Sequence, residues 1–474
     1  MKRRSINRSV LIAALAAASF ITYGAAAEAP GISLQDAAKM AFRNNKAIQI
    51  QEKEIDAARA DVELARSDFL PKVNLQTGYT HNDWVPQFGS GPGVEQKKDL
   101  GIFMGYKNDM QLGVTAGQTI YNGGSSVAQL NRSRIMFKVQ EQTLRACRLD
   151  VEFETRRLYY GLLLAFEVER ISRDLVVQAQ AHYEDVRNRF EQGMSSRFDL
   201  LQSKVYVSKQ IPVLVKAKND VDVTMADLKK LLGVKLKDEL RVEGTLEHEP
   251  LEVNEDGFFK TACEKKPEMV LKLLGIDLGW WNIEMAKSGF RPQIAANGGL
   301  NFRSDNVGDM FNSKHSNWNV GVTASVPIFD GWSTKARVDA AQAKYAEAAL
   351  GKEDVADQTA VDIRRACLDL AKAQSIIDSQ RDSVAEAKEA LRIAEISYTN
   401  GVGTNLDVLD AQTSLSQIEK ALCEAIYDYL MAKAFLERTM GVGMFDPPEA
   451  APQAPVVSAA AVPEGAAGEE RTAQ

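Results

Sequence analysis

The chain has 474 residues, of which 26% are charged and 45% hydrophobic, and its formal net charge is −7. Four basic residues before residue 10, an apolar run from Val10 to Ile21 and alanines at 25–27 are typical of a cleaved signal peptide. We therefore expect residues 1–27 to be removed and the mature chain to leave the cytoplasm. Without those four basic residues the net charge becomes −11, so nucleic acid is not an expected partner.

Beyond this leader no apolar run reaches the roughly 18 residues that a membrane-spanning helix needs, so any contact with a membrane must use strands or surfaces. The cysteines, at 147, 263, 367 and 423, fall in helical patterns without a metal-type spacing, and we expect free thiols. The sequence contains no nucleophile elbow, phosphate loop or H-E-x-x-H motif. We therefore expect no enzyme activity, no metal site and no cofactor.

The first half of the mature chain, residues 28–233, reads as one repeat unit. A stretch from Leu34 to Ser67 without Pro or Gly predicts a helix. Alternating apolar and polar residues on both sides of a long loop then predict a β-hairpin over 72–121. Two further Pro-poor helical patterns complete the unit, a long helix over 126–192 and a returning helix over 196–232.

Residues 256–445 repeat this plan after a linker at 234–255 that we expect at mid-height. The second unit is predicted to contain a helix from 256 to 289, a hairpin over 293–329, a long helix over 334–400 and a returning helix over 404–440. From the end of each hairpin onward, the matching positions are offset by 208 residues, and a repeat this long is a strong indication of shared geometry. The Pro- and Ala-rich tail, 446–474, is predicted to be disordered.

Each long helix would measure about 100 Å, which no single globular core accommodates, and its apolar residues recur at coiled-coil spacing. The helix reversals lie at Gly193–Gln202 and Gly401–Asp410. In each, Gly supplies a positive φ, and Ser196 or Thr404 can form a capping box with the Asp three positions later, which is Asp199 or Asp407.

The hairpins give four strands of about ten residues, each with one apolar and one polar face, as in transmembrane β-strands. Four strands cannot close a barrel, and lipid leaves no room for an unpaired edge, so several chains must share one barrel. Three copies would supply twelve strands. The alternative is a soluble domain of two hairpins on top of a coiled coil.

The motifs Phe69-Leu70-Pro71 and Phe290-Arg291-Pro292 before the strands, Pro327–Gly331 after the last strand, and the Gly401–Asp410 turn followed by Ala411-Gln412 resemble the TolC-type family of outer-membrane efflux and secretion channels. The resemblance covers nearly the whole mature chain. It implies an α+β membrane fold, a homotrimer with a shared 12-stranded transmembrane β-barrel in outer-membrane lipid, and a long α-helical barrel across the periplasm. It also implies a periplasmic tip that docks an adaptor protein leading to an inner-membrane pump.

The resemblance also implies roles for residues at the reversals. Asp407 and Asp410 match acidic rings that constrict the aperture and select cations, and Tyr398 matches a gating tyrosine. With Asp199, these three residues form the expected periplasmic aperture. Gly403 stands where some members carry an arginine that ties neighbouring helices. A cap is a sufficient reason for Asp199 or Asp407, whereas Asp410 has no capping role. The adaptor-docking tip comprises Gly193, Met194, Ser195, Ser196, Gly401, Val402, Gly403 and Thr404.

The function implied is a passive exit duct of a tripartite efflux pump or a type I secretion system. The rival from another class is a structural or adhesive periplasmic coiled coil that transports nothing. Dependence on detergent separates the two. Because a duct contacts its substrate through a wide, water-filled lumen, we expect the pump to select the cargo.

Overall fold

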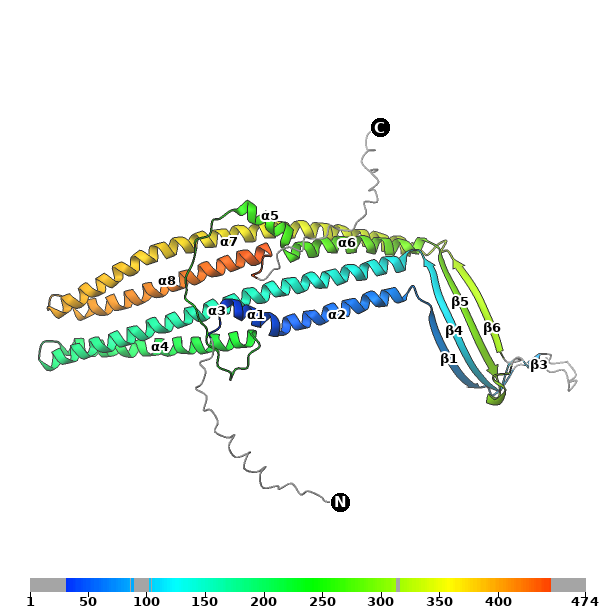
Figure 1. Cartoon of the computed structure of the whole chain (residues 1–474), viewed down its shortest axis with the longest axis horizontal. Helices are drawn as coiled ribbons and strands as arrows, with labels where there is room; N and C mark the ends of the chain where they lie inside the picture. The colour runs from blue at the N-terminus through cyan, green and yellow to red at the C-terminus, as the bar shows by residue number, and fades with distance from the viewer. Residues whose placement is uncertain (1–30, 86, 89–101, 104, 313–315, 445–474) are drawn as a thin grey trace, which may run out of the picture.

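The computed structural model describes residues 31–85, 87–88, 102–103, 105–312 and 316–444. The predicted signal peptide at 1–27 and the tail at 446–474 lie outside these residues. The described part is elongated, with a β-sheet at one end of a long helical bundle and the two helix reversals together at the other end (Figure 1). No helix in these described ranges is long and apolar enough to cross a membrane.

The bundle contains one set of helices from each repeat. Those of repeat 1 are α1 (Leu34–Asn44), α2 (Lys46–Ser67), α3 (Ser125–Glu191) and α4 (Arg197–Leu231). Those of repeat 2 are α5 (Glu255–Lys265), α6 (Pro267–Lys287), α7 (Ser333–Thr399) and α8 (Asn405–Met440), with short 3-10 turns η1 (Ser288–Phe290) and η2 (Val307–Asp309).

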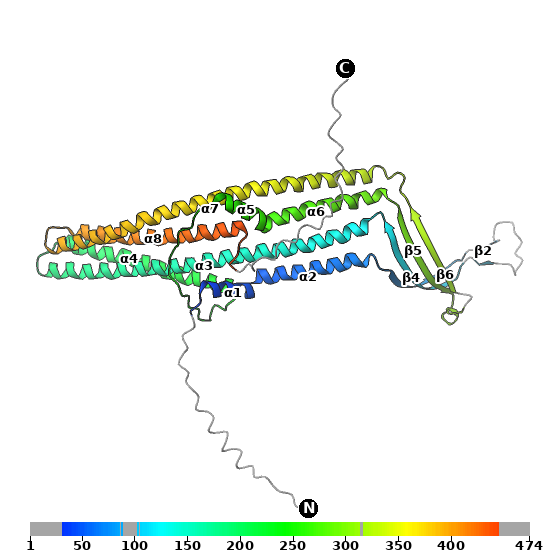
Figure 2. The same cartoon turned by 45° about the horizontal axis from the view of Figure 1, so that its top comes forward.

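The two long helices set the length of the molecule. Both α3 and α7 have 67 residues, which is about 100 Å at the helical rise of 1.5 Å per residue. Near the sheet, α2 packs along α3 and α6 along α7, whereas α4 and α8 cover the half toward the reversals (Figure 2). Because α3 also packs on α6 and α8, the two repeats form one bundle.

The helix that precedes each hairpin is broken, which corrects the prediction of continuous helices over Leu34–Ser67 and 256–289. Asn45 is extended, and its side chain accepts the N–H of Ala47 at 2.8 Å, so it ends α1 and caps α2. Lys266 is extended because Pro267 disfavours helical geometry in the residue before it, and Pro267 then starts α6.

The main sheet has the strand order β1-β4-β5-β6, and every neighbouring pair is antiparallel. Its strands are β1 (Lys72–His81), β4 (Asn108–Asn122), β5 (Gln293–Ser304) and β6 (Ser316–Ser325), and a small pair, β2 (Gln87–Phe88) and β3 (Ile102–Phe103), lies between β1 and β4 in the chain. The last strand ends at Ser325 and not at 329 as predicted. Pro327 has no N–H to donate to a ladder, which is a sufficient reason for the strand to end before it.

The strand register gathers the apolar residues on one face of the sheet. One row across the sheet reads Leu75, Val114, Leu300 and Trp318, and the next reads Gln76, Gly113, Asn301 and Asn317. In the single chain the apolar row is open, since Leu75 is 70% and Trp318 74% exposed. The sheet therefore has one apolar and one polar face, as the alternation in the sequence predicts.

Two hydrophobic clusters lie near the middle of the bundle, one in each repeat. The first includes Leu158, Leu162 and Leu228, and the second includes Ile363, Ile377 and Leu436. Leu246 of the linker packs against both clusters. The linker, residues 234–255, crosses the middle of the bundle and joins the two repeats (Figure 1).

Tyrosine side chains from both repeats fasten this linker. Tyr159 of α3 donates its hydroxyl to the carbonyl of Glu243. Tyr429 of α8 donates to the carbonyl of Glu249 at 3.0 Å and accepts the N–H of Leu251 at 2.8 Å. The linker is thus hydrogen-bonded to a long helix of repeat 1 and to the returning helix of repeat 2.

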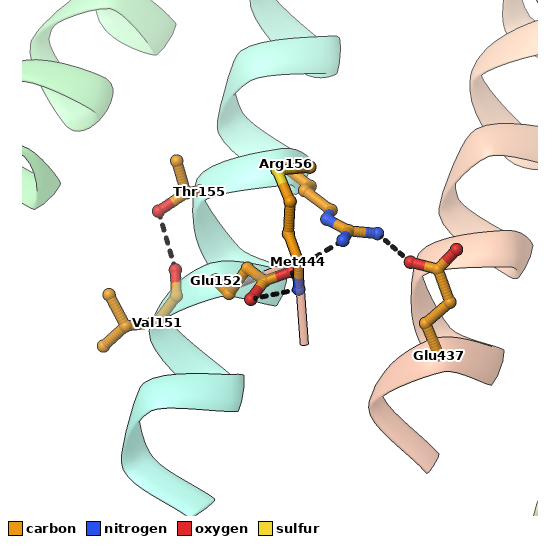
Figure 3. Close-up of polar contacts among 6 residues, drawn as sticks. All are labelled: Val151, Glu152, Thr155, Arg156, Glu437 and Met444. Atoms are coloured by element: carbon orange, nitrogen blue, oxygen red, sulfur yellow. Dashed lines mark hydrogen bonds and ion pairs between the residues drawn. The ribbon is translucent and has the colours of Figure 1, made fainter. Parts of the chain in front are cut away.

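A buried polar network joins α3 to the end of α8 (Figure 3). Arg156 donates to Glu152 at 2.6 Å and to Glu437, and Glu152 also accepts the backbone N–H of Met444 at 2.9 Å. Burial alone would lower the pKa of Arg156, but the carboxylates of Glu437 and Glu152 outweigh it and raise that pKa. The network fixes the last described residues of the chain against repeat 1.

Candidate functional site

The two helix reversals lie beside one another at the end of the bundle away from the sheet (Figures 1 and 2). Gly193 and Gly401 adopt φ values of +75° and +76°. The next N–H closes the helix in each case, from Met194 to the carbonyl of Arg189 at 2.8 Å and from Val402 to that of Ser397 at 3.0 Å. Both turns are therefore Schellman motifs that need a glycine for its left-handed backbone.

Both predicted capping boxes are present. The N–H of Asp199 donates to the Ser196 hydroxyl at 3.0 Å, and the N–H of Ser196 donates to the Asp199 carboxylate at 3.3 Å. The corresponding distances between Asp407 and Thr404 are 3.2 and 2.8 Å. The backbone N–H of Thr404, followed by its hydroxyl, lowers the pKa of Asp407, so this exposed carboxylate serves as a cap within the single chain.

Asp410 lies one helical turn beyond Asp407 and takes part in neither capping box. Its side chain is exposed, and it lies near Tyr206 of α4. Burial is the main cause that raises the pKa of Tyr206, and the negative charge of Asp410 adds to it. Tyr206 shares a hydrogen bond of 2.8 Å with Thr413 of α8. Asp410 is therefore an exposed carboxylate at the junction between α4 and α8.

Tyr398, at the end of α7, is held by side chains of repeat 1. The guanidinium of Arg189 lies 5.1 Å from the centre of its ring, and the His182 ring lies edge-on at 5.2 Å. Arg189 also donates to the carbonyl of Thr399 at 3.4 Å. Burial raises the pKa of the Tyr398 hydroxyl, and its hydrogen bond with Ser195 opposes this effect. Tyr398 thus contacts residues of the neighbouring reversal.

Gly403 packs tightly against the end of α7. A Cβ atom at this position would lie 3.0 Å from both the Cβ of Ser397 and the backbone nitrogen of Tyr398. The N–H of Gly403 donates to the carbonyl of Ser397 at 3.0 Å. A larger residue at position 403 would therefore need a small shift of the turn. In this chain the cation that contacts Tyr398 and the carbonyl of Thr399 is Arg189 of α3.

Asn405 is a central residue of the site that sequence reasoning missed. It is only 4% exposed, and its Oδ1 accepts from Ser203 at 3.0 Å and lies 2.7 Å from Nε2 of His182. Its Nδ2 donates to Gln202 at 3.0 Å. The first residue of a helix after a cap is normally exposed, and the matching residue of repeat 1 is the exposed Arg197, so no local pattern indicates that Asn405 is buried.

The predicted docking residues lie at the exposed turns, and the structure adds apolar residues to them. Met194 is 66% and Val402 83% exposed, and they occupy matching positions of the two repeats. Phe198 and Leu406 form a second matching pair and are 72% and 49% exposed. Within the described residues, no cluster of His, Cys, Asp and Glu side chains could hold a metal ion.

The family model described as outer membrane efflux protein matches residues 37–234 and 261–442. These two segments correspond closely to the two repeats. The family is one of channels and is not an enzyme family.

Curated relatives extend over most of the chain. Outer membrane protein TolC of Vibrio cholerae is 24% identical over 395 residues, which is 81% of this chain and 85% of the relative. The alkaline protease secretion protein AprF of Pseudomonas aeruginosa is 23% identical over 423 residues, covering 88% of this chain and 85% of the relative.

Solved structures show the same fold. The CmeC outer membrane channel of Campylobacter jejuni has a TM-score of 0.76 at 19% identity and covers 86% of this chain and 85% of its own. The open state of the MtrE outer membrane channel of Neisseria gonorrhoeae has a TM-score of 0.71 at 18% identity and covers 86% of this chain and 89% of its own. The chain therefore belongs to the outer membrane efflux protein family and is an outer-membrane exit duct for efflux or secretion, with its helical part in the periplasm.

Proposed function

We propose that three copies of this chain form one continuous passage, with a shared twelve-stranded barrel in outer-membrane lipid and a helical tunnel below it. The observation that carries this proposal is the four-stranded sheet with two open edges, β1 and β6. In an antiparallel order of four strands, the edge strands run in opposite directions. The β6 edge of one copy can therefore pair antiparallel with the β1 edge of the next.

The two flanks of the helical bundle offer a second pair of surfaces for contact between copies. Within the chain, α4 packs mainly on α3 and has apolar side chains that remain exposed, among them Leu201, Val205 and Val215 at 53%, 53% and 61%. On the other flank, Leu368 and Ile393 of α7 are 54% and 52% exposed. Apolar surfaces on both flanks of a bundle are suited to contact between copies.

At the reversals, we propose that Asp407 and Asp410 form carboxylate rings around the aperture, with Tyr398 as a gating contact. The exposure of both carboxylates and the contacts of Tyr398 with Arg189 support this role. Asp199, the capping residue of the other reversal, lies at the same end of the bundle.

The exposed turns would dock the periplasmic adaptor, which connects the duct to an inner-membrane pump. The docking residues would be Gly193–Ser196 and Gly401–Thr404. The matched apolar pairs Met194 with Val402 and Phe198 with Leu406 support this proposal, because such side chains suit a protein interface.

Cysteine cross-linking of the sheet edges tests the assembly. In a background without the native cysteines, one cysteine is placed on the polar face of β1, at Asn74 or Gln76, and one on that of β6, at Asn317 or Asn319. Within one chain these positions are separated by three strand spacings, about 14 Å, which exceeds the reach of a disulfide. We expect oxidised bands of two and three chains and none larger. If every pair in this set gives only single chains, the shared barrel is wrong.

A further inference from the structure

In the half of the bundle near the sheet, the two outer flanks are formed by α2 and α7. Helix α2 packs on α3, α3 on α6 and α6 on α7, so α2 and α7 lie on opposite sides of the bundle (Figure 2). Helix α2 leads into β1 and α7 follows β6, and these strands are the two open edges of the sheet. A neighbouring copy that pairs its β1 with this β6 therefore brings its α2 against this α7.

The face of α2 turned away from α3 carries an exposed stripe. Ile55, Ala58 and Val62 are buried or half-buried against the bundle. Roughly opposite them, at alternating spacings of four and three residues, every residue of the stripe is exposed: Lys46, Ile50, Lys53, Ala57, Ala60 and Leu64. Ile50 is 63% and Leu64 68% exposed, and they are the exposed large apolar residues of this helix.

The face of α7 turned away from α6 carries a stripe with the same spacing. Val338, Tyr345 and Thr359 are buried or half-buried on the α6 side. On the other side the exposed residues of the stripe are Ala336, Ala340, Ala343, Glu347, Leu350 and Asp354. Leu350 is 66% exposed. Each flank thus has a helix face that nothing within the chain covers.

The two stripes are complementary when they are aligned from the sheet. Since α2 ends at Ser67 and α7 begins at Ser333, residue n of α2 is level with residue 400 − n of α7. The helices run in opposite directions, α2 toward the sheet and α7 away from it. The residues that then face one another are Lys46 with Asp354, Ile50 with Leu350, Lys53 with Glu347, Ala57 with Ala343, and Ala60 with Ala340.

We propose that α2 and α7 of neighbouring copies form an antiparallel seam whose register is set by Lys53 with Glu347 and Lys46 with Asp354. This inference rests on the proposed assembly of three copies and names the residues by which one copy recognises the next. Within the chain Lys53 pairs with Asp56 at 3.0 Å, but both side chains are more than half exposed. Such exposed pairs contribute little, so the charge can exchange its partner.

The charges favour this register over its neighbours. A shift by one heptad in one direction leaves Lys53 opposite Ala340, and a shift in the other leaves Lys46 opposite Val361. Either shift therefore keeps one ion pair and loses the other. The alanines near the sheet allow the two helix axes to approach to about 8 Å. The seam thus combines close packing near the sheet with charges that specify the register farther from it.

Disulfide trapping tests the seam. In a background without the native cysteines, Ala57→Cys is combined with Ala343→Cys, which the register sets face to face. The controls combine Ala57→Cys with Ala336→Cys or with Leu350→Cys, each one heptad or about 10 Å away. Within one chain α3 and α6 separate α2 from α7, which exceeds the reach of a disulfide. We expect oxidised bands of two and three chains for the 57–343 pair, at several times the yield of either control.

The cross-links between the sheet edges separate the seam from the assembly. If the sheet edges cross-link and the 57–343 pair does not, the seam is wrong while the shared barrel stands. A control pair that reacts as well as the 57–343 pair would overturn the register. If the sheet-edge pairs give only single chains, the assembly fails and the seam fails with it.

Charge exchange supplies a second readout. Lys46→Glu with Lys53→Glu places like charges opposite one another at each seam, so the trimer that survives heating in detergent should fall severalfold. Adding Glu347→Lys and Asp354→Lys to the same chain should restore most of it, which only a partnership between these positions explains. Arg59→Glu with Arg66→Glu, on another face of α2, is the control and should have a smaller effect. If the fourfold variant is no more stable than the twofold one, the charged pairs do not exist.

Discussion

At the scale of single residues, experiment can separate the capping role of Asp407 from the aperture role that we propose for it. It caps α8 within the chain, and the proposed assembly places it with Asp410 around the aperture. Asp199 has the same capping geometry in repeat 1 and is therefore a matched control. A change in both ring residues should affect permeation, whereas a change at Asp199 should affect the helix cap.

We predict that the double variant Asp407→Asn, Asp410→Asn weakens cation selectivity and block by trivalent cations, because rings of negative charge attract them into the aperture. Planar-bilayer recordings measure both effects. Asp199→Asn should leave selectivity unchanged and cost about 1 kcal/mol of cap stability per chain. Unchanged selectivity in the double variant would mean that the carboxylates serve the turn and not the pore.

Arg156 offers a second test at this scale, because its removal leaves two carboxylates without their cation. The side chain of Glu152 is 5% and that of Glu437 28% exposed. We predict that Arg156→Met destabilises the fold by about 3 kcal/mol or more, since unpaired buried charges are costly. Denaturant unfolding in detergent measures the loss.

The neighbouring Arg157→Met is the control for this measurement. Arg157 pairs with Glu154 at 2.5 Å in an exposed position, where such a pair contributes below about 1 kcal/mol. If Arg156→Met and Arg157→Met lower the free energy of unfolding equally, the buried network contributes no more to stability than an exposed ion pair.

The cysteines give a prediction about reactivity. All four are free thiols, and burial raises the pKa of Cys423 to about 11. We predict that alkylation of the unfolded, unreduced protein adds four labels per chain. In the native protein at pH 8, Cys423 should react far more slowly than in the unfolded protein, because little of its thiol is present as thiolate. Mass spectrometry of labelled peptides measures both. Two or no labels after unfolding would indicate disulfides.

At the scale of elements, the polar contacts of Asn405 join α8 to α3 and α4 at the reversals. We predict that Asn405→Ala costs about 1–3 kcal/mol, because Ser203 and Gln202 lose a buried partner. Hydrogen exchange of peptides around both turns should become faster. Arg197→Ala, at the matching exposed position of repeat 1, is the control and should have little effect.

The elements themselves show what a sequence can specify. The glycines with positive φ and both capping boxes depend on neighbours in the chain, so the sequence predicts them well. The break at Lys266 is also encoded locally, since Pro267 follows it. Asn45 carries no comparable mark, and its amide finds a partner, the carbonyl of Leu231, only in the folded chain.

Contacts between the two repeats cannot be predicted from neighbouring residues in the sequence. The burial of Asn405 and the position of Arg189 over Tyr398 depend on how the helix pair α3–α4 packs against the pair α7–α8. Asn405 and Ser203, like Arg189 and Tyr398, are more than 200 residues apart in the chain. The positive φ of Trp332, +65°, is different, because the offset of 208 residues aligns Trp332 with Gly124, whose φ is +88°. The alignment of the two repeats therefore carries information about this backbone position.

At the scale of the whole molecule, the single chain leaves large apolar surfaces uncovered. The sheet exposes Val73, Leu75 and Val320 at 65%, 70% and 77%, and both strand edges lack a partner within the described chain. Detergent or lipid can cover an apolar face, but it cannot satisfy the backbone N–H and carbonyl groups of an open edge. Only another strand does that.

We therefore predict that the detergent-solubilised protein is a stable trimer, and that its mass, after correction for bound detergent, is three times that of the mature chain. Four strands per chain make twelve in a trimer, enough for a closed barrel with an open lumen. Electron microscopy of the particle should show a helical cylinder about 100 Å long, the length of α3 and α7. A monomer or dimer that is monodisperse without detergent would contradict both the shared barrel and the lipid contact, because in such a protein the apolar face and the edges would have to be covered within fewer chains.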